Sequence, residues 1–239
     1  MQKRTKIIVA SIVAGVVVLG ATAAIAGPVI YRDVIVGEAE AAPSVTAAPS
    51  AEADAGSGAG ADDSAEDLSG TWSVGAGSYA GYRVDEVLNG TDVTVVGRTE
   101  QVTGTLQVEE LSLTAAELTV DVATIETDSG NRDDYFRDTA LRVDEHPTAT
   151  FVLTEAITTD EAPVVGEVQT VQATGDLTLA GVTQTVTVEL EAVLNGETGQ
   201  VAGSIPITFA DFGVEAPNLG FVSVEPTGFI EFSLELQRA

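Results

Sequence analysis

Few side chains of this 239-residue chain could perform covalent chemistry. Cysteine is absent, which excludes disulfides, thiolate nucleophiles and zinc sites built on cysteine. His146 is the only histidine, so a catalytic triad or a metal site with several imidazoles would depend on this one residue. Because His146 precedes Pro147 at the start of an expected strand, we interpret it as a residue of a surface turn. No catalytic base with an orienting partner is visible, so an enzyme is the weakest of three hypotheses for function.

Two other groups of polar residues could bind a ligand without transforming it. The acidic pairs at positions 62–63 and 66–67 lack the spacing of a calcium-binding loop, so we expect a solvated linker and no metal site. Arg132 and Asp133 lie in a polar segment, where they could hold the headgroup of a ligand at the mouth of a barrel. The alternative is that this pair caps a helix or braces a loop.

Residues 70–239 show the two-residue alternation of half-buried antiparallel strands. Turn residues separate the runs, and the Asn-Gly pairs at 89–90 and 195–196 are strong hairpin signals. Seven or more strands with short connections predict an all-β barrel or sandwich. The polar segment 129–142 predicts a loop with a short helix between two strands. The apolar positions that we expect to face the interior are Val120, Val122, Phe151, Leu153, Val186, Val188, Leu190, Ile205, Ile207, Phe209, Ile230, Phe232 and Leu234.

One hairpin and several shorter motifs resemble a known family. Residues 175–188 read as a strand, a tight turn and a strand made largely of Leu, Val and Thr, with no nucleophile, metal ligand or phosphate loop. The other motifs follow in family order: Gly77–Glu86, Val96–Thr99, Val102–Gly104, Val120-Asp121, Arg132-Asp133, His146–Phe151 and Ile207–Gly213. On these motifs the chain resembles the YceI-like family of polyisoprenoid- and lipid-binding proteins, in particular its membrane-anchored actinobacterial branch.

The resemblance implies a lipocalin-like antiparallel β-barrel of about eight strands with a short helical insertion. A barrel of that size can hold one slender ligand, and the family's ligands are long isoprenoid chains such as quinone tails or polyprenyl lipids. The chain departs from the family pattern at two places. Ala180 stands in the hairpin where many members carry histidine, and Tyr135-Phe136 follows Arg132-Asp133 where many members carry His-Leu.

Residues 7–30 predict a transmembrane helix. They contain no charged residue, and about 20 apolar residues suffice to span a bilayer. The basic residues at positions 3, 4 and 6 predict that residues 1–6 are cytoplasmic and that the domain lies outside the cell membrane. A cleaved signal peptide is the alternative, since Ala24-Ile25-Ala26 has the form of a cleavage site. The apolar run exceeds the usual secretory length of about 7–15 residues, so we favour an uncleaved anchor.

Residues 31–69 predict an acidic linker rich in Ala, Ser and Gly. From Glu38 to Ser69 this composition cannot bury enough apolar surface to offset chain entropy, so we expect disorder. The whole chain carries 37 acidic and 10 basic residues, a formal net charge of −27. Such a charge repels nucleic acid and anionic headgroups, and solubility in salty or acidic surroundings is the explanation that we favour for it.

These observations favour a tethered extracytoplasmic barrel that sequesters or carries an isoprenoid chain and needs no cofactor. The competing hypothesis is a structural or partner-binding barrel of the cell envelope, filled by its own side chains. The two hypotheses differ in whether the barrel contains a continuous apolar void. Phe151, Phe209 and Phe232 are the large residues that we expect along this void or at its base.

Overall fold

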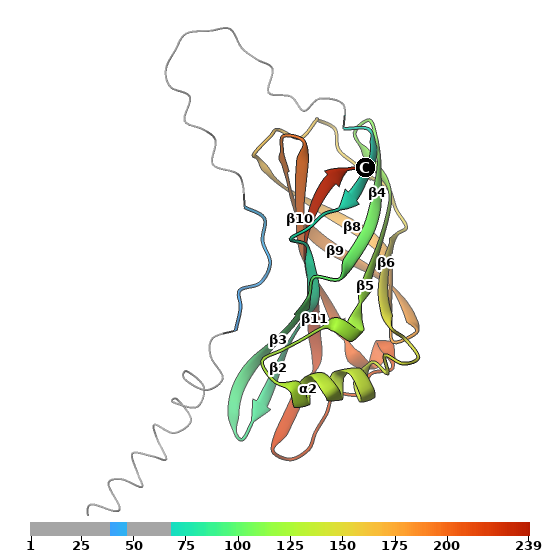
Figure 1. Ribbon diagram of the computed structural model, residues 1–239. Helices are drawn as coiled ribbons and strands as arrows, with labels where there is room; N and C mark the ends of the chain where they lie inside the picture. Colours follow the sequence, from blue (N-terminus) through green and yellow to red (C-terminus); the bar gives the residue numbers. More distant parts are fainter. Residues whose placement is uncertain (1–38, 47–67) are drawn as a thin grey trace, which may run out of the picture.

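The computed structural model describes residues 39–46 and 68–239, so the expected anchor at 7–30 lies outside the described residues. In the described ranges, no helix is both long enough and apolar enough to cross a bilayer. The described chain forms one antiparallel sheet that curls on itself, with a short helical segment at its lower end in the orientation of Figure 1.

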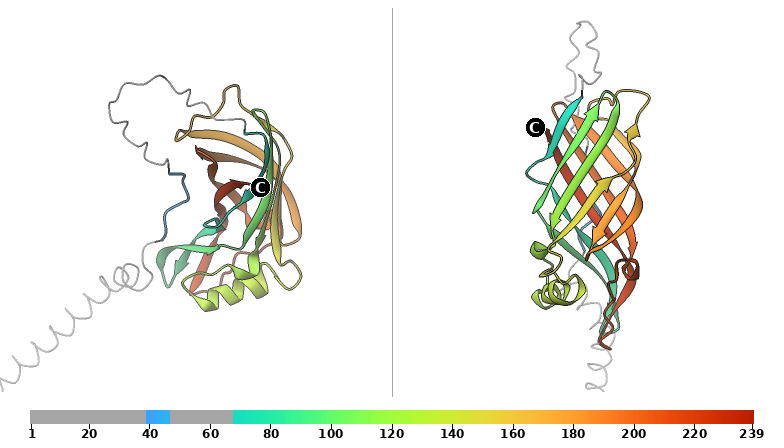
Figure 2. Two further views of the ribbon diagram at one scale, coloured as in Figure 1. Left: turned by 45° about the horizontal axis from the view of Figure 1, so that its top comes forward. Right: turned by 90° about the vertical axis from the view of Figure 1, so that its right-hand side faces the viewer.

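Eight strands close the barrel, and each lies beside the next round the ring (Figure 2). In spatial order they are β1 (Gly70–Val74), β4 (Val102–Glu109), β5 (Ser112–Asp121), β6 (Thr148–Leu153), β8 (Val168–Leu179), β9 (Val182–Asn195), β10 (Thr198–Thr208) and β11 (Val222–Arg238). The ring closes because β1 pairs with both β4 and β11. The prediction of an antiparallel β-barrel of about eight strands is therefore confirmed.

A hairpin extends the sheet below the closed ring. It consists of β2 (Tyr79–Leu88) and β3 (Thr91–Thr99). The long strand β11 pairs with β2 from residue 222 to residue 233 and with β1 from residue 236 to residue 238. The turn residues Asn89 and Gly90 have φ of 51° and 81°, as a primed two-residue turn requires. At the far end of β3, Arg98 and Glu126 exchange two backbone hydrogen bonds of 3.0 and 3.1 Å. The short strand β7 (Ile157–Thr158) pairs with β5.

The expected helical insertion between β5 and β6 is present. It comprises α2 (Gly130–Tyr135) and the π-helical turn η3 (Phe136–Ala140). Two 3₁₀ turns, η2 (Val122–Thr124) and η4 (Phe209–Phe212), follow β5 and β10. Figure 1 shows α2 beneath the barrel near the β2–β3 hairpin, so the insertion borders one end of the interior.

A charged cluster lies on the outer wall where β11, β2 and β3 run side by side. Glu231 pairs across strands with Gly81, which pairs in turn with Arg98. Since Gly81 has no side chain, Arg98 and Glu231 approach to 3.9 Å above it. The Arg83 Nε donates to Glu231 at 2.6 Å, and Glu231 is only 1% exposed.

Residues 39–46 lie against this outer wall. The Arg83 and Arg98 guanidinium groups donate to the backbone carbonyls of Glu40 and Ala41, at 2.6 and 2.9 Å, and Arg98 also pairs with the Glu40 carboxylate. The prediction of disorder from 38 to 69 rests on composition, which takes no account of hydrogen bonds such as these to a distant wall.

The same segment continues toward the upper end of the barrel. The backbone N–H of Val45 donates to Glu191 of β9 at 3.2 Å, and that of Thr46 donates to Gln200 of β10 at 2.9 Å. Residues 39–46 therefore cross the outer wall from the β2–β3 side to the β9–β10 side. The rest of the expected linker, apart from its last residues, lies outside the described range.

Candidate ligand-binding cavity

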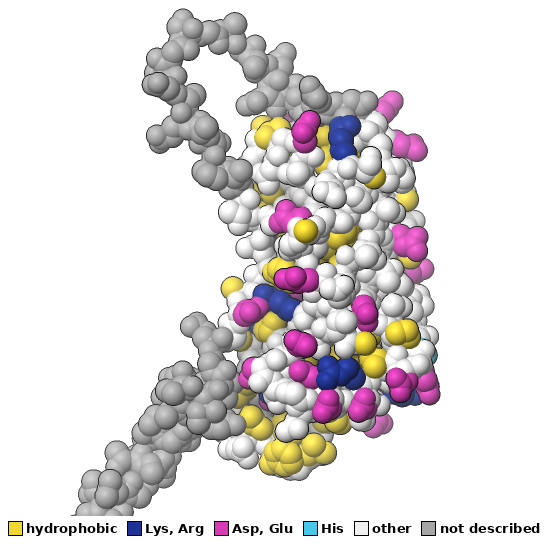
Figure 3. Space-filling view, in the orientation of Figure 1, with side chains coloured by type: hydrophobic (Ala, Val, Ile, Leu, Met, Phe, Trp, Pro, Cys, Tyr) yellow, Lys and Arg dark blue, Asp and Glu magenta, His cyan; other side chains and the backbone are white. Residues whose placement is uncertain are grey.

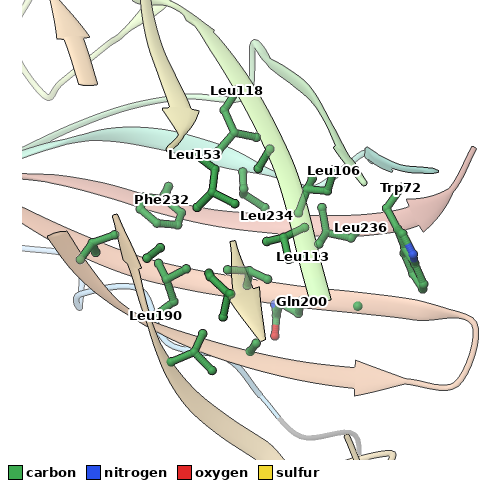
Figure 4. A pocket seen from close by; sticks show the side chains of 18 of the residues that line it. Trp72, Leu106, Leu113, Leu118, Leu153, Leu190, Gln200, Phe232, Leu234 and Leu236 are labelled. Atoms are coloured by element: carbon green, nitrogen blue, oxygen red, sulfur yellow. The ribbon is translucent and has the colours of Figure 1, made fainter. Parts of the chain in front are cut away.

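Two adjoining cavities occupy the barrel interior. The upper cavity, of about 310 Å³, lies inside the closed ring, and Figure 4 shows leucines from several strands converging on it. The lower cavity, of about 460 Å³, lies between β2, β11, α2 and the loop that follows η4. Ala80, Val120, Ala149 and Ile230 line both cavities. Two of these four shared residues are alanines, so little side-chain volume separates the cavities.

Large rings lie over glycines on the inner wall. The four pairs are Gly203 with Phe232, Gly175 with Phe151, Gly228 with Phe209 and Gly97 with Tyr82. A Cβ atom placed on Gly203 would lie 2.7 Å from Cζ of Phe232, which is closer than real Cβ contacts. The Phe232 ring thus occupies the space that the side chain of any other residue at position 203 would fill. This arrangement holds the four rings against the wall beside the two cavities.

Twelve of the thirteen residues predicted to face the interior line one of the two cavities. In the upper cavity they are Val120, Phe151, Leu153, Val188, Leu190, Ile205, Ile230, Phe232 and Leu234. In the lower cavity they are Val122, Ile207 and Phe209, together with the shared Val120 and Ile230. The exception is Val186, which lines neither. It packs against the hydrophobic cluster that includes Phe212, because η4 contacts β9 at this end of the barrel.

Several lining residues were not predicted. Ala80 and Ala149 lie at the junction of the cavities, and Trp72 and Leu106 line the upper one. Small residues give a weak hydrophobic signal, although Ala149 does alternate with Thr148 and Thr150. The inward face of β2 does not follow a purely apolar alternation, because its inward positions include the charged residue Glu86.

A polar group lies in the wall of the lower cavity. The Arg132 Nη2 donates to Glu86 at 3.0 Å, and its Nη1 donates to Asp128 at 2.5 Å. Burial alone would lower the pKa of Arg132, but the two carboxylates raise it above its ordinary value. Beside this group the Tyr82 ring stacks on Phe136 at a centroid distance of 4.8 Å. Burial raises the pKa of the Tyr82 hydroxyl far above its ordinary value, so this hydroxyl stays neutral.

Arg132 and Asp133 have different roles in the structure. Arg132 lines the lower cavity, whereas Asp133 does not. The buried Asp133 carboxylate accepts hydrogen bonds from the backbone N–H and the hydroxyl of Thr127, at 3.0 and 2.7 Å. Asp133 therefore braces the loop before α2, because these bonds hold its carboxylate against the loop.

No cluster of ligands for a metal ion is present in residues 39–46 and 68–239. The His146 ring lies against the turn between β8 and β9, where a Cβ on Gly181 would be 2.5 Å from its Cε1. His146 lines neither cavity. The arrangement as a whole offers a largely apolar interior with the Arg132–Glu86 ion pair near its lower end, which suits the binding of a long apolar molecule.

The comparison with known protein families agrees with this geometry. Residues 73–236 match the model of the YceI-like domain. The chain belongs to the YceI-like family. No match was found among curated protein sequences. The family hairpin is the turn between β8 and β9, in which Ala180 and Gly181 adopt φ of 49° and 79°.

Two solved structures share the YceI-like fold. One is a polyisoprenoid binding domain from Saccharophagus degradans implicated in plant cell wall breakdown, with a TM-score of 0.58 and 19% identity, covering 70% of this chain and 98% of that one. The other is BcnA of Burkholderia cenocepacia, with a TM-score of 0.52 and 23% identity, covering 66% of this chain and 95% of that one.

Proposed function

We propose that this YceI-like domain binds the apolar chain of an isoprenoid, or of another long-chain lipid, along the axis of its barrel. The observation that carries the proposal is the pair of adjoining cavities, which share Ala80, Val120, Ala149 and Ile230. The structural likeness to a polyisoprenoid binding domain supports the same ligand class. A barrel filled by its own side chains, the competing hypothesis, does not account for cavities of about 310 and 460 Å³.

The energetics favour a long chain over a short one. Burying a methylene group contributes about 0.8 kcal/mol, so a five-carbon isoprene unit contributes up to about 4 kcal/mol. Association costs roughly 4–15 kcal/mol before any contact contributes. A single unit therefore barely offsets the cost of binding, whereas several units in succession give a stable complex. We include no catalytic step in this proposal.

We further propose that residues 7–30 anchor the protein in the cell membrane, with the barrel outside. The support is the uncharged run of 24 positions and the basic residues before it. A tethered barrel would take up a lipid close to the bilayer that contains it. Cleavage after Ala26 would give the same barrel in soluble form.

Closing the junction between the cavities tests the lipid-binding proposal. Ala149→Phe places a ring among residues shared by both cavities. Expelling even one isoprene unit should then weaken binding about 100-fold or more, since 1.4 kcal/mol is tenfold in affinity. The matched control is Ala115→Phe on the exposed face of β5. Affinity is measured by displacement of a fluorescent isoprenoid.

Lipid extraction and native mass spectrometry of the purified protein provide the complementary measurement. The proposal predicts a co-purifying long-chain lipid, or saturable binding of an added isoprenoid. A protein that neither carries lipid nor binds isoprenoids of any length would contradict the proposal and favour the structural hypothesis.

A further inference from the structure

We infer that this barrel selects lipids whose headgroup is uncharged and bears an oxygen atom, such as an alcohol or a quinone-type carbonyl, over the same chains carrying a phosphate. The inference rests on the proposed function and concerns the chemistry at the two ends of the cavities. It separates two ligand classes, polyprenyl phosphates and neutral isoprenoids, that an apolar interior alone does not distinguish.

Acidic residues dominate the charged positions of both cavities. Among the described residues that line them, the carboxylates are Glu86 and Glu215 in the lower cavity and Glu110 and Glu167 in the upper one. Arg132 is the one basic residue among the described residues that line the two cavities. Figure 3 shows the wider setting, in which acidic side chains outnumber basic ones on the visible face. A phosphate at either end would therefore meet a negative local field.

Arg132 already has two carboxylate partners. Its guanidinium bridges Glu86 at 3.0 Å and Asp128 at 2.5 Å. A phosphate that recruited Arg132 would take it from Glu86, which is only 5% exposed. Removing one partner of a buried ion pair leaves an uncompensated charge, which is strongly unfavourable. Arg132 therefore neutralises the carboxylates of Glu86 and Asp128 and does not provide a binding site for an anion.

A neutral headgroup meets no such obstacle. Tyr82 lines the lower cavity, and no group among the described residues hydrogen-bonds to its hydroxyl. This hydroxyl can donate to a carbonyl oxygen or accept from an alcohol. Because a neutral headgroup also loses less hydration than a phosphate on burial, the balance of desolvation and hydrogen bonding favours it.

The test uses two ligands with the same C20 chain, geranylgeraniol and geranylgeranyl phosphate, each displacing a fluorescent isoprenoid from the full-length protein. We expect the phosphate to bind at least tenfold more weakly than the alcohol. Raising the salt concentration should strengthen phosphate binding through screening and leave alcohol binding within twofold. This salt series needs no variant, so it holds whether or not any substituted protein folds.

Glu86→Gln assigns the effect to the lower cavity. An amide at this position keeps an oxygen that accepts from Arg132 and removes the negative charge. Phosphate affinity should rise several-fold while alcohol affinity stays within twofold, and Glu117→Gln on the exposed face of β5 should change neither. Equal or tighter binding of the phosphate by the unsubstituted protein would overturn the inference while leaving the proposed function intact. Binding of neither ligand would overturn the proposed function itself.

Discussion

Replacing Gly203 with alanine tests whether rings over glycines keep the interior open. A Cβ at this position would lie 2.7 Å from Cζ of Phe232 and 2.9 Å from Cδ2 of Leu190. Non-bonded carbons prefer separations of about 3.5–4.0 Å, so the Phe232 ring must shift by about 1 Å. Both obstacles are side-chain atoms, and both residues line the upper cavity. The ring can therefore move toward the void without displacing the backbone.

Two measurable effects should follow from Gly203→Ala. Overpacking a filled core usually costs about 1–3 kcal/mol, and here we expect the low end of that range because the void accepts the ring. The displaced ring excludes roughly one or two methylene groups of a bound chain, at about 0.8 kcal/mol each, which weakens lipid binding by about 4- to 15-fold. Urea unfolding measures the first effect and displacement of a fluorescent isoprenoid measures the second.

Gly199→Ala on the same strand is the matched control. Its Cβ would meet Val193 and Leu236 only at 3.7 and 3.8 Å, which is ordinary contact, although Gly199 also lines the upper cavity. We expect little change in lipid affinity from this substitution. Unchanged affinity for Gly203→Ala, together with a destabilisation near 3 kcal/mol, would refute the reasoning, since it would mean that no void receives the Phe232 ring.

Three other perturbations test separate parts of the structure. In urea unfolding, Phe151→Ala should lower the free energy of unfolding by less than the roughly 3–5 kcal/mol that removal of a packed ring costs. Phe212→Ala, at a core position that is 2% exposed, should show the full cost. Equal losses of stability for the two variants would contradict an open interior. Deleting residues 39–46 should lower the melting temperature by a few degrees, since each hydrogen bond makes a net contribution of about 1 kcal/mol. In a protein that carries Arg98→Gln, the same deletion should lower the melting temperature by less. An unchanged melting temperature on deletion would mean that the contacts with the wall are negligible. Protease treatment of intact cells should remove the barrel and leave a membrane stub containing 7–30, whereas release of a soluble protein starting near Gly27 would favour the cleaved signal peptide.

Local sequence pattern was sufficient to predict the barrel and most of its inward face. Residues such as Ile205 and Ile207 alternate with polar neighbours, and the side-chain period of a strand places them on one face. Turn chemistry was equally informative, because Asn89-Gly90 adopts the left-handed conformations that its sequence favours. Both signals act over a few residues, which is why they can be interpreted without knowledge of the tertiary structure.

Features that depend on distant contacts could not be predicted in this way. Glu86 faces inward on β2 because Arg132, 46 positions later, supplies its partner. The docking of residues 39–46 depends on Arg83 and Arg98, which meet only when β2 and β3 pair. In each case the hydrogen-bond partner of a polar group comes from a distant part of the chain. Composition and alternation, which are local properties, therefore do not predict the contact.

The hollow interior follows from strand register more than from hydrophobicity. Val and Leu at alternate positions would be just as compatible with a filled barrel, and the difference comes from inward glycines placed beside rings. Gly203 lies directly opposite Phe232 in the pairing of β10 with β11. A slip of one residue would turn the glycine outward and put a side chain against the ring. Inward glycines paired with aromatic residues on the neighbouring strand are therefore the sequence feature that we expect to distinguish hollow YceI-like barrels from filled ones.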